Sequence, residues 1–183
     1  MNRIARRIVA SIVSAGLAGA ALLTGSPANA APDYGPYLFI NNSSHLCMDV
    51  VGGDRASGAR IQQWYCWGGA PQRWTEEYVM TIGVTHYYRL RNLETGKCLD
   101  VPGGDSAPGV LLQQWDCWAD ARQGYMQLWA VETQPFSPPV PTSRVKNLMT
   151  GRCVDDKDWS NTPGTLLQQW TCEDTPPQQW HIP

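Results

Sequence analysis

The sequence has 183 residues, with 14 basic and 16 acidic side chains and a formal net charge of −2. The few basic residues are scattered along the chain, which argues against a nucleic-acid partner. Nine tryptophans stand against two phenylalanines, and tryptophan suits places that need an apolar face and one polar edge.

Residues 1–30 have the pattern of a secretory signal peptide. Arg3, Arg6 and Arg7 precede an apolar stretch rich in glycine and alanine, and Ala28-Asn29-Ala30 is a small-x-small cleavage site. The stretch is short for a transmembrane anchor, and no later segment is apolar enough to span a bilayer. We therefore predict a secreted, extracellular protein. Its mature part, residues 31–183, has 11 basic and 16 acidic side chains, a net charge of −5, and is long enough for one domain with its own core.

A pattern of residues occurs three times in this mature part, in units at about 37–80, 86–134 and 142–183. Each unit has two cysteines 19 positions apart, with an aspartate two positions after the first and a Gln-x-Trp just before the second. Each unit closes with another Gln-x-Trp. An asparagine lies six positions before each first cysteine and a glycine eleven positions after it. The second unit has four extra residues between its second cysteine and its closing tryptophan.

Short strand signals fill the units. The first of them, in chain order, are YLFI at 37–40, LCMDV at 46–50, ARIQQWYC at 59–66 and YYRLRN at 87–92. Clusters of Gly, Pro, Asn and Asp separate them, and no useful helical period follows residue 30. The prediction is an all-β fold with about four strands per unit. The run QPFSPPVPT at 134–142 replaces a matching segment of the repeat, and we expect its prolines to remove a regular strand from the second unit.

All six cysteines lie in the predicted secreted part, where disulfides are allowed. Six cysteines permit about 15 connectivities, and the repeat selects one bridge per unit. The predicted bridges are Cys47–Cys66, Cys98–Cys117 and Cys153–Cys172. Metal binding is the weaker alternative, because the sequence has no Cys-x-x-Cys pair and only three scattered histidines. We expect no metal and no other cofactor.

These repeats resemble the ricin B-chain-type (QxW) lectin domain. Cys-x-Asp, Gln-x-Trp-x-Cys and a closing Gln-x-Trp agree in order and spacing in all three units, and the resemblance covers residues 37–183. It implies a β-trefoil with three pseudo-symmetric repeats: twelve strands, six in a barrel and the others in three hairpins that cap it. It also implies sugar binding, with up to one shallow pocket in each repeat.

The resemblance implies a sugar-binding set in each repeat: Asp49, Trp64 and Gln72; Asp100, Trp115 and Gln127; Asp155, Trp170 and Gln178. An exposed indole offers an apolar platform to the C–H face of a pyranose, and a carboxylate accepts hydrogen bonds from its hydroxyl rim. The first glutamine of each Gln-Gln-Trp should point the same way as the tryptophan, because alternate side chains of a strand share a face. The closing glutamines would brace the aspartates. The closing tryptophans, Trp74, Trp129 and Trp180, are expected in the core. Trp67 and Trp118 could extend the rim of a pocket, at the place that Glu173 holds in the third repeat.

One departure from the family pattern affects all three units. Sugar-binding members usually have an asparagine just before the closing Gln-x-Trp, where this chain has Pro71, Met126 and Pro177. Proline and methionine side chains offer little hydrogen bonding, so we expect weaker pockets or a different sugar. The extra residues of the second unit should bring Asp120, Arg122, Gln123 and Tyr125 close to its pocket. This argument ranks the second repeat first and the third last.

The sequence thus favours a secreted lectin for galactose-type or related sugars on polysaccharides or glycans. The alternative is a non-catalytic trefoil with degenerate sugar sites that binds a protein, for example as an inhibitor or a toxin accessory subunit. We predict no enzyme activity, because a glycosidase needs two neighbouring carboxylates and the three repeated aspartates should lie in separate pockets. Asp155, Asp156 and Asp158 are interpreted as a solvated turn rather than a calcium loop.

Overall fold

The computed structural model describes residues 32–120, 123–134 and 141–183, so the predicted signal peptide lies outside the described residues. Within these ranges every regular element is a strand or a single-turn 3-10 helix. The strands are β1 (Tyr34–Tyr37), β2 (Ile40–Asn41), β3 (Cys47–Val50), β4 (Ile61–Trp64), β5 (Trp74–Ile82), β6 (Thr85–Asn92), β7 (Cys98–Asp100), β8 (Gln113–Trp115), β9 (Trp129–Gln134), β10 (Thr142–Asn147), β11 (Cys153–Asp156), β12 (Leu167–Trp170) and β13 (Trp180–His181). The 3-10 helices are η1 (Val51–Gly53), η2 (Ala70–Gln72), η3 (Pro102–Gly104), η4 (Tyr125–Gln127), η5 (Lys157–Trp159) and η6 (Pro176–Gln178).

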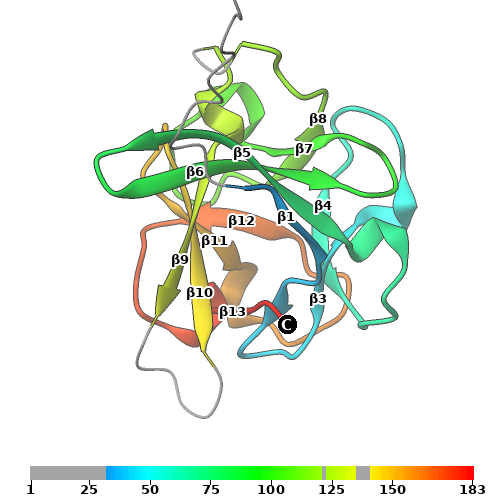
Figure 1. The fold of residues 1–183 in the computed structure, drawn as a ribbon. Coiled ribbons are helices and arrows are strands. Elements are labelled where there is room, and N and C mark those ends of the chain that lie inside the picture. The colour runs from blue at the N-terminus through cyan, green and yellow to red at the C-terminus, as the bar shows by residue number, and fades with distance from the viewer. Residues whose placement is uncertain (1–31, 121–122, 135–140) are drawn as a thin grey trace, which may run out of the picture.

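The strands curl into an antiparallel barrel in which the end of each repeat pairs with the start of the next (Figure 1). These junctions are β5 with β6, β9 with β10, and the C-terminal β13 with β2. β6 and β10 also pair with the closing strands of their own repeats, β9 and β13. In the first repeat β1 pairs with β5 and β2 pairs with β13. The first strand of that repeat is therefore divided in two, and the thirteen strands of the described residues correspond to the twelve predicted for a β-trefoil.

Three hairpins complete the fold, one in each repeat: β3–β4, β7–β8 and β11–β12. The predicted disulfides Cys47–Cys66, Cys98–Cys117 and Cys153–Cys172 are confirmed. Each first cysteine begins the first strand of its hairpin, and each second cysteine lies two residues beyond the last residue of the second strand. Each bridge therefore joins the strand that bears the aspartate to the end of the strand that bears the exposed tryptophan.

The closing tryptophans form the centre of the core, as predicted. Trp74, Trp129 and Trp180 are fully buried among Leu, Ile, Val, Phe and Met side chains. Each indole Nε1 donates a hydrogen bond to a backbone carbonyl; that of Trp129 is 3.0 Å from Leu99 O. The polar edge of each ring is thus satisfied inside the core, which is the usual condition for burying a tryptophan.

The prediction that the proline-rich run removes a strand from the second repeat is wrong. Residues 135–140 lie outside the described residues, but the strands on either side of them, β9 and β10, pair without interruption from Gln134↔Thr142 to Trp129↔Asn147. The prolines fall between these two strands, so they displace none of the hydrogen bonds of the barrel.

Candidate functional site

Each repeat has one pocket on its hairpin, and all three pockets share an aspartate, a glutamine and a tryptophan. Their volumes are about 580 Å³, 300 Å³ and 160 Å³ in the first, second and third repeats. The first is lined by Asp49, Val51, Gly52, Gly53, Gln62, Trp64, Trp67 and Pro71. The second is lined by Asp100, Gly103, Gln113, Trp115, Trp118 and Met126. The third is lined by Asp155, Asp158, Trp159, Gln168, Trp170, Glu173 and Thr175.

The aspartate of each pocket is held by the glutamine directly opposite it in the hairpin. Asp100 pairs with Gln113 in the register of β7 and β8, and Gln113 Nε2 donates to Asp100 Oδ1 at 2.7 Å. The same bond has a length of 2.8 Å in the first and third repeats, from Gln62 to Asp49 and from Gln168 to Asp155. These three glutamines line the pockets and were missing from the predicted site. Their constant spacing from the aspartate was the signal that could have identified them.

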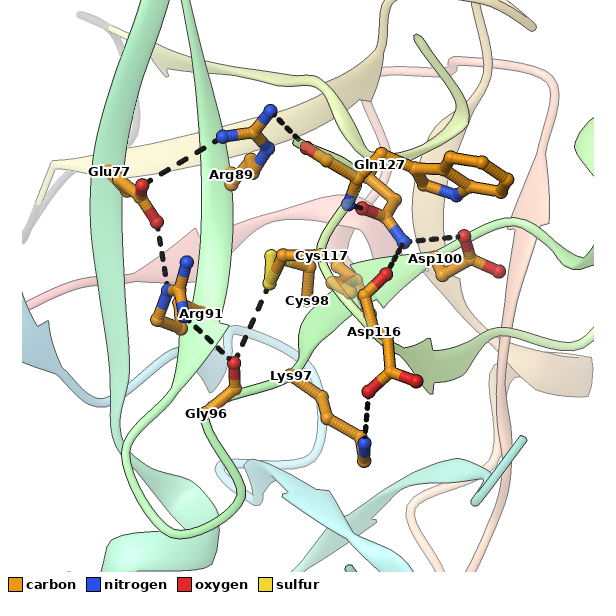
Figure 2. Close-up of a disulfide and its surroundings, with 12 residues drawn as sticks. Glu77, Arg89, Arg91, Gly96, Lys97, Cys98, Asp100, Asp116, Cys117 and Gln127 are labelled. Carbon is orange, nitrogen blue, oxygen red and sulfur yellow. Dashed lines mark hydrogen bonds and ion pairs between the residues drawn. A yellow bond between two sulfur atoms is a disulfide. The ribbon is translucent and has the colours of Figure 1, made fainter. Parts of the chain in front are cut away.

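The closing glutamines support the aspartates from behind, as Gln127 shows (Figure 2). Gln127 is fully buried, and its Nε2 donates to Asp100 Oδ2 and to Asp116 O, both at 3.0 Å. Its Oε1 accepts the backbone N–H of Trp118 at 3.0 Å. Gln178 makes the corresponding contacts with Asp155, Thr171 and Glu173, and Gln72 contacts the backbone of Tyr65 and Trp67.

This arrangement settles where the predicted site residues Gln72, Gln127 and Gln178 lie. None of them is among the residues that line the three pockets. Each amide oxygen and nitrogen already has a protein partner. Gln127 and Gln178 thus hold the aspartates of their pockets, and all three glutamines hold the backbone beside the pocket.

Burial raises the pKa of Asp49, Asp100 and Asp155 above the ordinary aspartate value, and the glutamine amides that donate to them offset part of this rise. In Asp155 the charges of Glu173 and Asp158 raise the pKa further. A carboxylate has about four acceptor positions, and the two amides occupy one on each oxygen of Asp100 and Asp155. The remaining positions are available to hydroxyl donors in the pocket.

The tryptophan of each Gln-Gln-Trp is partly exposed, in contrast to the buried closing tryptophans. Trp64, Trp115 and Trp170 are 39%, 40% and 38% exposed, as a stacking platform requires. Each ring lies against a glycine of another repeat. A Cβ built on Gly164 would lie 3.4 Å from the Trp64 ring, and Gly164 has a φ of +91° that favours glycine. Gly58 and Gly109 lie in the same way against Trp115 and Trp170.

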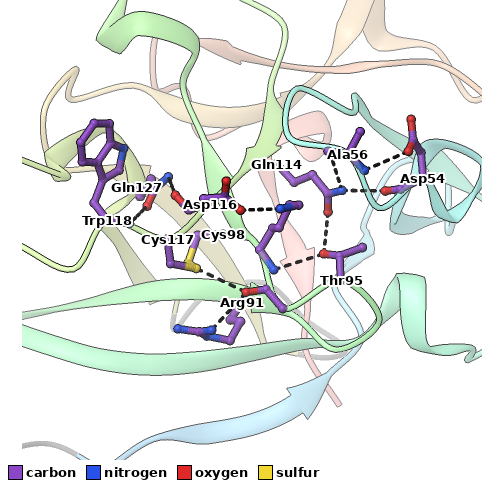
Figure 3. A network of polar contacts seen from close by, with 12 residues as sticks. Asp54, Ala56, Arg91, Thr95, Cys98, Gln114, Asp116, Cys117, Trp118 and Gln127 are labelled. Atoms are coloured by element: carbon purple, nitrogen blue, oxygen red, sulfur yellow. Dashed lines mark hydrogen bonds and ion pairs between the residues drawn. A yellow bond between two sulfur atoms is a disulfide. The ribbon is translucent and has the colours of Figure 1, made fainter.

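The middle glutamine of each Gln-Gln-Trp joins two repeats (Figure 3). Gln114 Nε2 donates to Asp54 O at 2.6 Å and to Ala56 O at 3.0 Å, both in the first repeat. Its Oε1 accepts from Thr95 Oγ1 at 2.7 Å. Gln63 and Gln169 make equivalent bonds. The repeated phrase therefore contains one residue that holds the aspartate, one that joins the repeats and one that forms the platform.

The family asparagine has no functional substitute at its own position. Pro71 and Met126 line the first and second pockets with apolar atoms, whereas Pro177 is buried. Trp67 and Trp118 line the first two pockets, and Glu173 lines the third, as their spacing suggested.

Three of the residues expected near the second pocket do not line it. Asp120, Gln123 and Tyr125 are not among the described residues that line it, and Arg122 lies outside the described residues. The described residues thus give no support to ranking the second repeat first, and the first repeat has the largest of the three pockets.

The acidic cluster of the third repeat is not a solvated turn. Asp155 and Asp156 are buried in β11, at 6% and 0% exposure, and only Asp158 projects from η5. Within the described ranges no group of three or more His, Cys, Asp or Glu side chains could hold a metal ion. No helix among the described residues is long and apolar enough to cross a membrane.

Comparisons with known proteins match both halves of the chain to lectin families. A model described as "Ricin-type beta-trefoil lectin domain-like" matches residues 27–115, and one described as "Ricin-type beta-trefoil lectin domain" matches residues 86–183. A designed threefold-symmetric protein, ThreeFoil, is 23% identical with a TM-score of 0.69, over 80% of this chain and 96% of that one. A lectin from Macrolepiota procera in complex with lactose is 22% identical with a TM-score of 0.61, over 86% of this chain and 98% of the lectin. An exo-β-1,3-galactanase from Clostridium thermocellum is 25% identical with a TM-score of 0.68, over 80% of this chain but 29% of the enzyme.

Proposed function

Because the chain belongs to the ricin-type β-trefoil lectin family, we propose that it is a secreted protein that binds carbohydrate through its three hairpin pockets. The observation that carries this proposal is the threefold combination of a half-exposed indole with a carboxylate held by amide donors. In the first pocket these groups are Trp64, Asp49 and Gln62. A pyranose has an apolar C–H face and a rim of hydroxyls, and the pocket presents a surface to each.

We propose galactose-type or related sugars as the ligands, carried on a polysaccharide or a glycan. Support comes from the structural neighbours, one of which is a lectin in complex with lactose and another an exo-β-1,3-galactanase that contains a similar domain. Three shallow pockets favour a polymer over a free monosaccharide. A single site of about millimolar affinity corresponds to roughly 4 kcal/mol, and simultaneous contact at several sites can raise the effective strength by about two orders of magnitude or more.

The proposal is one of binding without catalysis. A glycosidase of the common type needs a general acid and a second carboxylate about 5–10 Å apart. The first and second pockets are each lined by one carboxylate, Asp49 or Asp100, and that carboxylate is held by a glutamine amide. Three carboxylates line the third pocket, where Asp158 is paired with Lys157 and Asp155 is held by two glutamine amides. Such a group is suited to accept hydrogen bonds from sugar hydroxyls.

A glycan and polysaccharide array tests the proposal directly. The purified, fully oxidised protein would be compared with a triple variant, Trp64→Ala, Trp115→Ala and Trp170→Ala, whose folding is checked by circular dichroism. We expect binding to one class of sugar that the triple variant loses. A folded protein with three bridges that binds no glycan on a broad array would contradict the proposal.

One observation favours a second candidate, a trefoil that binds a protein. Pro71 and Met126 replace a polar contact with apolar atoms at the edge of two pockets. In that case the three tryptophan variants should reduce capture of a protein partner while the glycan array stays silent.

Secretion is proposed from the N-terminal pattern, with support from the three disulfides, which form in oxidising compartments. Expression of the full chain in a secreting host, followed by mass spectrometry of the medium, tests it. The expected product begins at Ala31. Retention of the uncleaved chain in the cells would contradict this part of the proposal.

A further inference from the structure

The third pocket differs from the other two at positions that the pseudo-symmetry makes equivalent. Five residues after the first cysteine, the first two repeats have Gly52 and Gly103, whereas the third has Asp158. Directly after the second cysteine they have Trp67 and Trp118, whereas the third has Glu173. Both acidic residues line the third cavity. Three carboxylates therefore line a pocket that is lined by one in each of the sibling repeats.

The third pocket nevertheless keeps two indoles. Trp170 holds the platform position, and Trp159 lines the cavity from η5, where the other repeats have a glycine. Trp159 is 59% exposed. Asp158 and Trp159 have φ values of 59° and 55°, a left-handed conformation that costs non-glycine residues about 1–2 kcal/mol each. Glycine at these two positions would avoid this cost, but Asp158 and Trp159 add a carboxylate and an indole to the lining of the cavity.

The charges around this cavity favour a cation. Of the three acids that line it, Asp158 alone has a cationic partner among the ion pairs of the described residues, namely Lys157. Glu173 has no cationic partner among the ion pairs of the described residues. The like charges of Glu173 and Asp158 already act on Asp155 at the base of the pocket. A ligand ammonium would relieve this repulsion, and the indole faces would add a cation–π attraction.

We propose that the third pocket is selective for an amino sugar, a hexosamine unit whose free amine is protonated. This inference rests on the proposed function, because it takes the pocket to be a sugar site and names its ligand class. The ring would lie on Trp170, its hydroxyls would face Asp155 and Gln168, and its ammonium group would lie between Asp158 and Glu173. The first and second pockets have no such pair of carboxylates and take uncharged sugars.

The test uses a background variant, Trp64→Ala with Trp115→Ala, which leaves only the third platform. Isothermal titration calorimetry at about pH 6, where amino groups are protonated, would compare a glucosamine tetramer with its N-acetylated form. The two ligands share ring and linkage and differ in charge. We expect the charged tetramer to bind about tenfold more tightly, from two carboxylates that each contribute a few-fold, and the preference should weaken as salt screens the charges.

Two variants assign the effect to the pocket. Asp158→Asn with Glu173→Gln should bring the two tetramers to within about twofold of each other, and Asn tolerates the left-handed conformation. Asp174→Asn is the matched control, because it removes a neighbouring charge that does not line the cavity, and the tenfold preference should survive it. Equal binding of both tetramers, or a preference that persists in the double variant, would overturn the inference. If the protein with all its tryptophans still binds neutral glycans on the array, the proposed function stands; if it binds neither class, both fail.

Discussion

Replacing Gln127 by leucine should destabilise the protein, and more at neutral than at acidic pH. The buried amide makes three hydrogen bonds of 3.0 Å, to Asp100, Asp116 and Trp118. Each contributes about 1 kcal/mol, and a buried partner left unsatisfied costs about 1–3 kcal/mol. Leucine fills the volume and recovers part of this loss by apolar burial. The expected decrease in the free energy of unfolding is therefore about 2–4 kcal/mol near pH 7.

The pH dependence follows from the direction in which folding shifts the pKa of Asp100. Burial raises the pKa of Asp100 from its ordinary value of 3.8, and Gln113 and Gln127 offset part of the rise. Removal of Gln127 should raise this pKa further. A carboxyl whose pKa is higher in the folded state holds its proton more tightly there, so stability falls as the pH rises through the interval between the two values. At about pH 3, where Asp100 is protonated in both states, the loss should shrink to about 1–2 kcal/mol.

Urea unfolding with intact disulfides, followed by tryptophan fluorescence at both pH values, measures the two losses. Gln123→Leu is the matched control, because Gln123 is exposed and its replacement should change the stability by less than about 0.5 kcal/mol. An equal loss for Gln127→Leu at both pH values would refute the role of the amide in holding a charged Asp100. A loss as small as that of the control would refute the whole account of the buried glutamine.

Three further predictions concern the platform, the joint between repeats and the core. Trp64→Ala should weaken binding to the polysaccharide identified on the array by about tenfold or more, equivalent to about 1.4 kcal/mol. The loss should exceed that of Trp170→Ala, because the first cavity is larger than the third. Equal losses in calorimetry would contradict this order. Gly164→Ala should lower both stability and sugar affinity, because Gly164 has a φ of +91° and an added Cβ would lie 3.4 Å from the Trp64 ring. Gly83→Ala, at a φ of +63° with no neighbour within 4 Å, should lower stability alone. A Gly164 variant with unchanged affinity would show that the glycine does not support the platform. Burial raises the pKa of Asp156 from 3.8 to about 7, although the Gln63 side chain offsets part of this rise, so the stability of the protein should fall as the pH rises between these values. Asp156→Val should remove that fall in thermal unfolding measured from pH 4 to 8 (about the range over which the carboxyl titrates), and an unchanged pH profile would show that Asp156 is not the group that titrates.

The sequence alone was sufficient for the parts of the fold that depend on spacing. Repeated intervals between cysteines, aspartates and tryptophans predicted the repeat and the three bridges, whereas the division of the tryptophans into core and platform residues came from the resemblance to the lectin family. The predictions from spacing were correct because the distance of a residue along a strand determines its place in a hairpin and the face on which it lies. The prediction from the proline-rich run was wrong because it rested on composition. Composition predicts an irregular segment, but it does not show whether that segment replaces a strand or lies between two strands.

Contacts between repeats could not be predicted from the spacing of residues within one repeat. Gly164 lies against Trp64 from a segment 100 residues away in the sequence, and spacing within a unit contains no information on which repeat supplies the neighbour. The same limit hid the joint made by Gln114 with Asp54 and Ala56. Asp158 and Trp159 were not recognised as parts of a pocket, because the left-handed turn that directs them is set by the fold around η5.

The three residues of Gln-Gln-Trp have different roles, and these roles are relevant to whether the pockets bind a ligand. The middle glutamine joins repeats and the bridged cysteines join strands, so both contribute to the fold whether or not a ligand binds. The first glutamine also holds a carboxylate at the base of a cavity. The exposed tryptophan contacts a glycine of another repeat, yet it keeps nearly two fifths of its surface in solvent. A buried aspartate and an exposed indole both cost free energy in the unliganded protein. All three repeats retain the pair, and a ligand with hydroxyls and an apolar face is what would offset the cost of both.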